Sequence, residues 1–549
     1  MTFSSMARYH ILREMSKETF DVLIIGGGIT GCGIALDAAT RNMKTGLIEM
    51  QDFAAGTSSR STKLVHGGLR YLKQFEVKLV AEVGKERAIV YENGPHVTKP
   101  EWMLLPIHKG GTFGTFSTSL GLRMYDFLAG VKKSERRSML NTIETLNKEP
   151  LLKEEGLSGS GYYVEYRTDD ARLTIEVLKE AVAQGAKAVN HTKVTELLYE
   201  NQKVVGVVAK DEISNETFTL YAKKVINATG PWVDTFREMD HSRSGKNVRL
   251  SKGVHIVIDQ GTFPLKQAVY FDTPDGRMIF AIPRAGKTYV GTTDTFYEGD
   301  PINPRITSED KSYLLAAIHD MFPTVKLAER DIESSWAGVR PLIYEEGKNP
   351  SEISRKDEIW QSTSGLITIA GGKLTGYRKM AETVIDLVAK LLEKEDNLVF
   401  NSCSTKTLPI SGGQVGGSRG FQEFINSYEE RALEAGFLLV EYENLVQLYG
   451  SNIVKIIGLA NGYQADQHFG LPLDLYVQLV YSLQEEMTVK PVDFFIRRTG
   501  ALYFNINWVR KWSQSVIAFM SDKCGWTTEQ ENHYKQQLNR QIQEAASTN

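Results

Sequence analysis

The stretch D-V-L-I-I-G-G-G-I-T-G-C-G-I-A at residues 21–35, with T-G-L-I-E at residues 45–49, decides the fold. The apolar run at 22–25 predicts a buried parallel strand, and the glycines after it predict a tight turn into a helix. A second strand follows at 45–48. This strand–helix–strand order is typical of an α/β fold built on a parallel sheet.

The glycines have the spacing of a dinucleotide-binding turn. Gly26, Gly28 and Gly31 form G-x-G-x-x-G, which permits the turn, a close backbone approach to a pyrophosphate, and close helix–strand packing. The start of the helix offers free N–H groups to phosphate. Glu49 ends the second strand, where a carboxylate can accept a hydrogen bond from a ribose hydroxyl. Together these features predict a dinucleotide site.

The composition is that of an ordinary globular protein with more than one domain. The 549 residues exceed what one hydrophobic core supports, so two or three domains are expected. A net charge of −3 gives no reason to expect nucleic acid as a partner. The three cysteines are far apart, which predicts neither a disulfide framework nor a cysteine metal site; no metal is expected, and a reducing cytoplasm suits the chain.

The sequence contains no secretory signal and no run of about 18 apolar residues of the kind that spans a membrane. We therefore expect a protein that is soluble or bound to a membrane surface. Residues 116–128 are apolar on one helical face, and that face either packs against another domain or rests on a membrane.

Further elements follow the first unit. Helices are predicted at about 75–91 and 173–184, and strands at about 194–198, 204–209 and 223–228. Alternating patterns at 250–293 predict antiparallel strands. Residues 365–379 again predict a strand, a glycine turn and a helix. Residues 408–420 form a linker, and the chain from 421 onward is mostly helical, as at 445–459 and 475–484.

Three later segments favour a flavin over a nicotinamide. Residues 57–62 supply hydroxyls and backbone donors enough to surround a long dinucleotide; the hydroxyls belong to Thr57, Ser58, Ser59, Ser61 and Thr62. The segment N-A-T-G ending at Gly230 lets backbone pass close to a cofactor. Gly371, Gly372 and Lys373 precede a helix whose positive end would stabilise an anionic reduced flavin.

The order of these motifs resembles the FAD-dependent glycerol-3-phosphate dehydrogenases, respiratory members of the D-amino-acid-oxidase-like flavoprotein superfamily. The resemblance rests on the glycine turn, on G-T-S-S-R-S-T-K-L-V-H-G-G-L-R-Y at 56–71, and on four later blocks, which are I-N-A-T-G-P-W-V, S-K-G-V-H-I-V, W-A-G-V-R-P-L and I-A-G-G-K-L-T-G-Y-R-K. It covers about residues 20–400, and the helical tail resembles the family's C-terminal domain. One departure is Gly376, where a second threonine commonly follows Thr375.

The resemblance implies an α/β fold with three domains. A discontinuous Rossmann-like FAD-binding domain is expected over residues 20–100, 165–250 and 335–400. An antiparallel β-sheet substrate domain is expected over 101–164 and 251–334, and an all-helical C-terminal domain over 401–549. The cofactor-binding set that we expect includes Leu374 and Thr375 beside Lys373.

The resemblance also implies a dianionic substrate, glycerol 3-phosphate, which calls for convergent cations. Arg70, Arg340 and Lys373 lie in matching motifs, and Tyr71 adds a hydroxyl. For catalysis, a group must take the proton of the C2 hydroxyl while hydride passes to the flavin. We expect His255 or His66 as that base.

Arg340 polarising the substrate oxygen, with water taking the proton, is the alternative route for the proton. The leading hypothesis is an FAD-linked dehydrogenase that makes dihydroxyacetone phosphate and passes electrons to a membrane quinone. We expect this enzyme in the cytoplasm, attached peripherally to the inner face of the cell membrane. The rivals are an oxidase that reduces oxygen to peroxide, a nicotinamide-dependent dehydrogenase, and a non-catalytic flavin-binding protein. Whether the chain forms a homodimer stays open.

Overall fold

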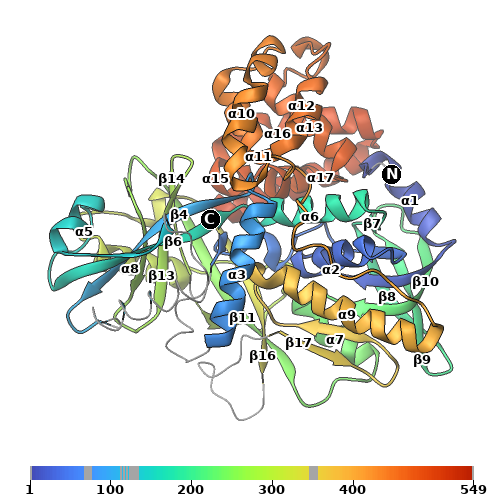
Figure 1. The fold of residues 1–549 in the computed structure, drawn as a ribbon. Coiled ribbons are helices and arrows are strands. Elements are labelled where there is room, and N and C mark those ends of the chain that lie inside the picture. The colour runs from blue at the N-terminus through green and yellow to red at the C-terminus, as the bar shows by residue number, and fades with distance from the viewer. Residues whose placement is uncertain are drawn as a thin grey trace.

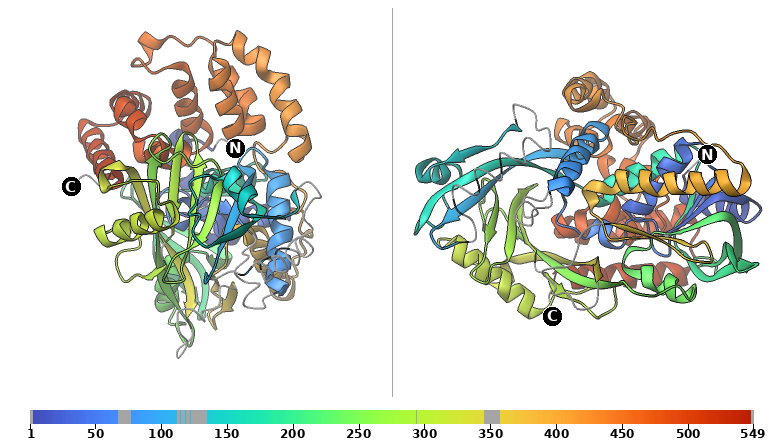
Figure 2. Two further views of the ribbon diagram at one scale, coloured as in Figure 1. Left: turned by 90° about the vertical axis from the view of Figure 1, so that its left-hand side faces the viewer. Right: turned by 60° about the horizontal axis from the view of Figure 1, so that its bottom comes forward.

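The computed structural model describes residues 3–66, 77–111, 114, 118, 122, 135–292, 294–344 and 357–546. Two sheets lie next to each other in the lower part of the molecule, and the C-terminal helices form a layer above them (Figure 1). The same arrangement is visible from two further directions (Figure 2). Residues 116–128, predicted to be an apolar helix, lie almost entirely outside the described residues.

The first sheet contains eight strands within the described part of the chain, in the order β17-β18-β10-β1-β2-β7, with β9 beside β10 and β8 beside β9. From β18 to β7 neighbouring strands are parallel. The strands are β1 (Thr19–Ile25), β2 (Thr45–Ile48), β7 (Lys187–Val189), β8 (Thr192–Glu200), β9 (Lys203–Asp211), β10 (Thr217–Asn227), β17 (Glu358–Gln361) and β18 (Ile367–Ala370). The parallel core predicted from residues 21–49 is therefore present.

Helices cover the first sheet. Helix α2 lies between α6 and α9 and contacts both, which explains why it consists almost wholly of small and apolar residues. The helices associated with the two sheets are α1 (Arg8–Met15), α2 (Ile29–Thr40), α3 (Val77–Asn93), α5 (Thr142–Lys148), α6 (Asp170–Ala183), α7 (Val233–Met239), α8 (Ser308–Met321) and α9 (Tyr377–Asp396). The predicted helices at 75–91 and 173–184 correspond to α3 and α6.

The second sheet contains ten strands among the described residues and is mostly antiparallel, as predicted, although β4 and β12 are parallel. Its strands are β3 (Leu64–Val65), β4 (Thr98–His108), β5 (Ser138–Leu140), β6 (Leu157–Thr168), β11 (Asn247–Asp259), β12 (Ala268–Asp272), β13 (Met278–Arg284), β14 (Lys287–Gly291), β15 (Thr295–Phe296) and β16 (Ile332–Tyr344). β3 and most of β16 fall within ranges predicted for the first domain, yet they pair within this sheet. The domain boundaries stay a prediction.

The C-terminal part is helical, as predicted. It comprises α10 (Gly417–Glu434), α11 (Leu439–Tyr449), α12 (Ile453–Leu459), α13 (Leu473–Glu485), α14 (Pro491–Asp493), a π-helical turn (Phe494–Arg498), α15 (Ala501–Phe504), α16 (Ile506–Cys524) and α17 (Thr528–Ala546). None of the described helices is both long enough and apolar enough to cross a membrane.

One predicted helix is divided. The apolar pattern at 445–459 continues through two helices, α11 and α12, which are separated at Gly450. Gly450 has φ 54°, and a Cβ there would lie 2.0 Å from the carbonyl oxygen of Gly412 in the preceding linker. The linker therefore passes so close to residue 450 that only glycine fits there. The helix ends at this point, although the apolar pattern continues across it.

In the glycine turn, α2 packs very closely against the end of β1. A Cβ on Gly31 would lie 1.9 Å from the carbonyl oxygen of Gly26, and Gly26 itself has φ 112°. The missing side chain at Gly31 lets α2 approach the end of β1 directly. This approach sets the position of the helix N-terminus.

We predict that Gly31→Ala lowers the thermal unfolding midpoint, because a methyl group must displace backbone; overpacking of this kind costs about 1–3 kcal/mol or more. The matched control is Gly458→Ala in α12, where an added Cβ meets no atom within 4 Å. That exchange should stabilise by up to about 1 kcal/mol through helix propensity. Equal midpoints for the two variants would contradict the close contact.

Candidate active site

A cavity of about 650 Å³ is lined by residues of both sheets. On the side of the first sheet it is bounded by the turns that follow β1, β2, β10 and β18. The carboxyl ends of parallel strands meet at one edge of a sheet, and this edge is where α/β proteins bind nucleotides. The early, middle and late glycine segments of the sequence therefore converge on a single site.

The glycine turn and Glu49 form one wall. Oε2 of Glu49 accepts a hydrogen bond of 2.7 Å from the backbone N–H of Gly27, and Oε1 accepts one of 2.8 Å from that of Gln51. Burial raises the pKa of Glu49, and these two N–H donors lower it in part. Gly26, Gly28 and Glu49 all line the cavity, so the predicted ribose acid lies beside the predicted pyrophosphate turn.

Two hydroxyls of the 57–62 segment fasten it to the first sheet's helices. The Oγ of Ser58 accepts a 2.9 Å hydrogen bond from the N–H of Ile29, and so gives the first N–H of α2 a partner. The hydroxyl of Ser61 donates to Asp170 at 2.7 Å. Both side chains also line the cavity.

The remaining hydroxyls differ in their surroundings. Thr57 lines the cavity and donates a 2.6 Å hydrogen bond to the carbonyl of Val339 in the second sheet. Ser59 is buried, does not line the cavity, and its Oγ has no hydrogen-bond partner among the described residues. Most of these hydroxyls thus hold the loop in place, and the sequence could not reveal their protein partners.

We predict that Ser58→Ala lowers the stability of the apoprotein by about 1 kcal/mol, the usual net contribution of one hydrogen bond. The matched control is the neighbouring Ser59→Ala. Because the Ser59 hydroxyl is buried without a partner, its removal should cost nothing. Thermal unfolding of the two apoproteins measures the difference, and a larger loss for Ser59→Ala would refute the role of the Ser58 hydrogen bond.

The glycine turn after β18, at Gly371 and Gly372, forms another wall of the cavity. Gly372 has φ 85°, and a Cβ there would lie 2.4 Å from the sulfur of Met380 in α9. Gly230 also lines the cavity, as do Lys373, Leu374 and Thr375. The hydroxyl of Thr375 accepts from the N–H of His66 and donates to its carbonyl, both at 3.1 Å. This pair joins the predicted late cofactor segment to the segment that carries a candidate base.

Arg340 lines the cavity from β16. Its Nη1 lies 3.1 Å from Oδ1 of Asp294, and both side chains are about one third exposed (31% and 33%). Arg340, Lys373 and His66 thus line one cavity. Arg70 and Tyr71, the other predicted substrate-binding residues, lie outside the described residues.

His255 takes a different position from His66. It lies on β11, is only 1% exposed, and stacks on Trp336 with ring centroids 4.6 Å apart. Its Nε2 lies 3.1 Å from Oγ1 of Thr62, which does line the cavity. Nδ1 has no hydrogen-bond partner among the described residues. Burial, with Arg340 and Lys63 adding to it, lowers the pKa of His255 well below its ordinary value, so the ring is neutral.

Sequence reasoning missed several residues of the wall formed by the second sheet. Tyr270 and Phe280 stack with centroids 4.2 Å apart, and Phe280 lies 6.2 Å from the ring of His66. Asp294 was missed as well. Aromatic residues in strands with an alternating pattern are common in the core of any sheet. No local signal therefore distinguishes these cavity residues from core residues. Asp294 follows the strand β14 in G-T-T-D-T, a small-residue turn that did offer a hint.

Comparison with known proteins agrees with this geometry. Residues 21–378 match the family described as "FAD dependent oxidoreductase", and residues 403–531 match the "C-terminal domain of alpha-glycerophosphate oxidase". The chain is 61% identical over 544 residues to the aerobic glycerol-3-phosphate dehydrogenase of Bacillus subtilis (strain 168), covering 99% of this chain and 98% of that one. The chain belongs to the FAD-dependent glycerol-3-phosphate dehydrogenase family.

Two further relatives support the assignment. The aerobic glycerol-3-phosphate dehydrogenase of Staphylococcus haemolyticus (strain JCSC1435) is 59% identical over 551 residues, covering 100% of this chain and 99% of that one. A crystal structure of glycerol-3-phosphate dehydrogenase from Bacillus halodurans, complexed with FAD, superimposes with a TM-score of 0.87 at 50% identity, covering 99% and 98% of the two chains. The predicted family, fold class and cofactor are thereby confirmed.

The residues present fit FAD. The cavity has the size of a cofactor site, and backbone of the glycine turns at Gly26, Gly28 and Gly372 lines it. The N-terminus of α2 follows the glycine turn, as a pyrophosphate site requires. Glu49 ends the next strand, where its carboxylate can accept a hydrogen bond from a ribose hydroxyl. Gly26, Gly28 and Glu49 would hold the adenosine diphosphate half, with Gly31 allowing the close packing of α2, while Lys373, Leu374 and Thr375 would contact the flavin half.

Proposed function

We propose that this member of the family oxidises sn-glycerol 3-phosphate to dihydroxyacetone phosphate. FAD, when bound, accepts the C2 hydride. The observation that carries the proposal is the convergence of Arg340, Lys373 and His66 in the same cavity as the cofactor turns. A site that only stored flavin would have no use for cations beyond the cofactor's own phosphates. The relatives at about 60% identity bear the name of this activity.

Arg340 and Lys373 are the substrate-binding cations in this proposal, with Arg70 and Tyr71 completing the phosphate site. Asp294 restrains Arg340 through the 3.1 Å contact, which fixes the direction of the guanidinium before substrate arrives. Preorganised charge of this kind lowers the cost of binding a small dianion.

For the proton of the C2 hydroxyl, we assign a route through Thr62 to His255. Nε2 of His255 lies 3.1 Å from the Thr62 hydroxyl, and Thr62 lines the cavity. The route requires the tautomer in which Nδ1 carries the proton and Nε2 accepts from that hydroxyl. A substrate hydroxyl that donates to Thr62 Oγ1 could pass its proton on to Nε2 in one concerted movement. His66, which lines the cavity itself, is the second candidate.

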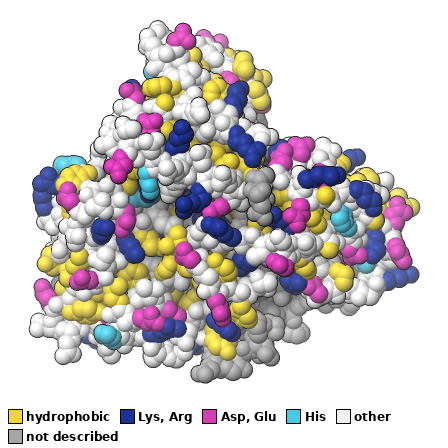
Figure 3. All heavy atoms as spheres, turned by 180° about the vertical axis from the view of Figure 1, so that it is seen from behind, with side chains coloured by type: hydrophobic (Ala, Val, Ile, Leu, Met, Phe, Trp, Pro, Cys, Tyr) yellow, Lys and Arg dark blue, Asp and Glu magenta, His cyan; other side chains and the backbone are white. Residues whose placement is uncertain are grey.

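The electron acceptor in this proposal is a membrane quinone, and the enzyme works at the inner face of the cell membrane as a peripheral protein in the cytoplasm. On the face shown in Figure 3, basic and acidic side chains are interspersed, so no broad positive area is present there.

The decisive experiment is an anaerobic reduction of the purified yellow protein by glycerol 3-phosphate, followed at the flavin absorbance. We expect bleaching that a quinone analogue reverses quickly and air reverses slowly. Fast reoxidation in air with peroxide release would identify the oxidase. A yellow protein that does not bleach would be a flavin-binding protein without this activity.

The same titration tests the cation site. We predict that Arg340→Ala raises KM by about tenfold or more, the loss expected from one charge-assisted contact worth about 1.5–3 kcal/mol, while FAD stays bound. Arg305→Ala is the control, because Arg305 lies on the surface and pairs with Glu544. An unchanged KM in Arg340→Ala would disprove the substrate-site assignment.

We predict that Thr62→Val lowers kcat by about 10²-fold or more, the lower end of the contribution of a positioned proton acceptor. Thr62→Ser should retain most of the rate. Because the lowered pKa keeps His255 deprotonated, the acid-side loss of kcat should occur well below about pH 6.5, the ordinary range of histidine. Full activity of Thr62→Val together with an inactive His66→Gln would transfer the role to His66.

A further inference from the structure

The loop that follows Glu49 reaches from the cavity to the C-terminal helical domain. Within residues 49–56, here named the ribose loop, Glu49, Gln51, Ala55 and Gly56 line the cavity. The loop is fastened to the glycine turn by a 2.9 Å hydrogen bond from the N–H of Ala54 to the carbonyl of Gly27. Any movement of the ribose loop therefore moves the pyrophosphate turn as well.

Asp52 is the one charged residue in the ribose loop besides Glu49, and it points away from the cavity. It is 1% exposed. Its carboxylate accepts hydrogen bonds from Nε of Arg497 at 2.5 Å and from Nη1 and Nη2 of Arg498 at 2.7 and 3.0 Å. Asn190 donates a fourth bond at 2.9 Å. A carboxylate with this many donors is held rigidly.

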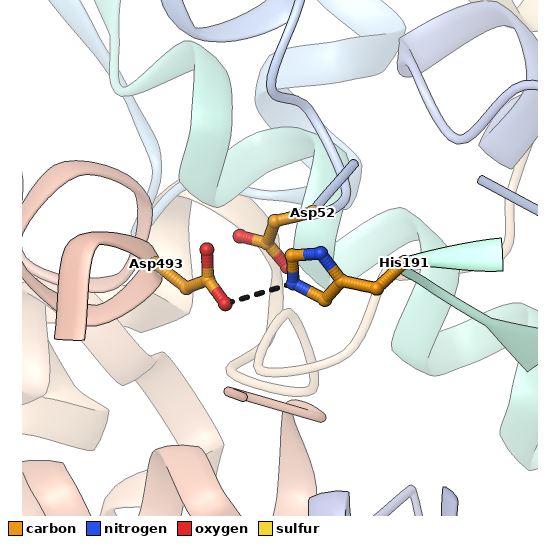
Figure 4. Close-up of side chains that lie close together, drawn as sticks. All are labelled: Asp52, His191 and Asp493. Carbon is orange, nitrogen blue, oxygen red and sulfur yellow. Dashed lines mark hydrogen bonds and ion pairs between the residues drawn. The ribbon is translucent and has the colours of Figure 1, made fainter. Parts of the chain in front are cut away.

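Both arginines belong to the C-terminal domain. They end the π-helical turn Phe494–Arg498, a rare form of helix that is frequent at functional sites. Arg497 also binds Asp493 at 2.5 Å, and Asp493 accepts from His191 at 3.1 Å (Figure 4). Each of the two carboxylates is thus paired with at least one guanidinium group.

Asp52, His191 and Asp493 place one ligand atom each within 4.8 Å of the others, a grouping that could suggest a metal ion. The two arginines already supply the positive charge that both carboxylates require. Burial alone would raise the pKa of Asp52, but Arg498 and Arg497 outweigh it and keep the pKa below its ordinary value. The grouping is therefore an ion-pair cluster that joins two domains.

The backbone beside Asp52 needs this support. Ala54 has φ 63° and His191 has φ 50°, so both adopt the left-handed conformation that costs free energy for residues other than glycine. Such conformations persist only where surrounding contacts determine them. His191 is also bonded to the loop itself, because its N–H donates to the carbonyl of Gln51 at 2.7 Å.

We propose that Arg497 and Arg498 are positioning residues for FAD: they hold Asp52 and thereby fix the ribose loop against the glycine turn, so that FAD affinity depends on the C-terminal domain. The proposal rests on the assignment of this side of the cavity to the FAD ribose and pyrophosphate. It gives the helical domain a role in the flavin site although none of its residues lines the cavity among the described residues.

The test is FAD binding to apoprotein, measured by the change of flavin fluorescence. Asp52→Asn, which keeps the shape but loses the charge, should weaken FAD binding by about tenfold or more, equivalent to ~1.4 kcal/mol. Arg498→Lys keeps the charge and loses the two-pronged contact, so it should weaken binding less. If Asp52→Asn does not fold, Arg498→Lys alone tests the proposal.

The matched control is Lys179→Met. Lys179 lies in the same interface and bridges Glu176 and Glu486 at 2.9 and 3.2 Å, but it does not contact the ribose loop. Its loss should lower the unfolding temperature without changing FAD affinity. A residue with a purely structural role lowers the midpoints of apoprotein and holoprotein equally, whereas a positioning residue reduces the rise in midpoint that FAD produces.

Glu49→Gln is the reference for a direct contact. If Glu49→Gln weakens binding while Asp52→Asn and Arg498→Lys bind FAD as the unchanged protein does, the positioning role is refuted and the site stands. If none of the three weakens binding, both the positioning role and the ribose assignment are refuted. Weaker binding in Lys179→Met equal to that in Asp52→Asn would also refute the role, because the effect would then be general to the interface.

Discussion

The close packing of α2 against the end of β1 is the constraint on which the rest of the site depends. Gly31 lies so near the carbonyl of Gly26 that any side chain would displace the backbone. This contact sets where α2 begins and where the N–H groups of its first turn point. The hydrogen bond to Ser58 then fixes that helix start to the 57–62 segment, which itself borders the cavity. A shift of the helix would move every group that faces the pyrophosphate.

The second determinant is the buried ionic interface between the sheets and the C-terminal helices. Besides the cluster around Asp52, Arg172 of α6 pairs with Glu176 and with Glu486, and all three side chains are fully buried. Removing one partner of such a pair leaves an uncompensated charge and costs about 3–5 kcal/mol. The interface therefore fixes one position of the helical domain on the sheets. A shift of the domain relative to the sheets would separate several ion pairs at once.

The two histidines illustrate how far residue type constrains chemistry. Both lie in family motifs, and the sequence made His255 the first candidate and His66 the second. The structure gives them different surroundings: His66 faces the cavity, whereas His255 is enclosed, neutral and connected to the cavity through the Thr62 hydroxyl. Burial explains the low pKa of His255, and burial depends on strands β11 and β16, which are about 80 residues apart in the chain.

The sequence by itself determined the parallel α/β core, the glycine turn, the helical tail and the family, because these depend on local periodicity and on short motifs. It also singled out Glu49, Arg340 and Lys373, which all line the cavity. Only the tertiary structure decided that Ser58 binds the start of a helix, that Gly450 divides a predicted helix, and that Arg497 and Arg498 reach the ribose loop. Those features arise from contacts between segments far apart in the chain: Asp52 and Arg498 are separated by 446 positions. No local pattern records such a pairing, since its free energy depends on how the whole chain packs.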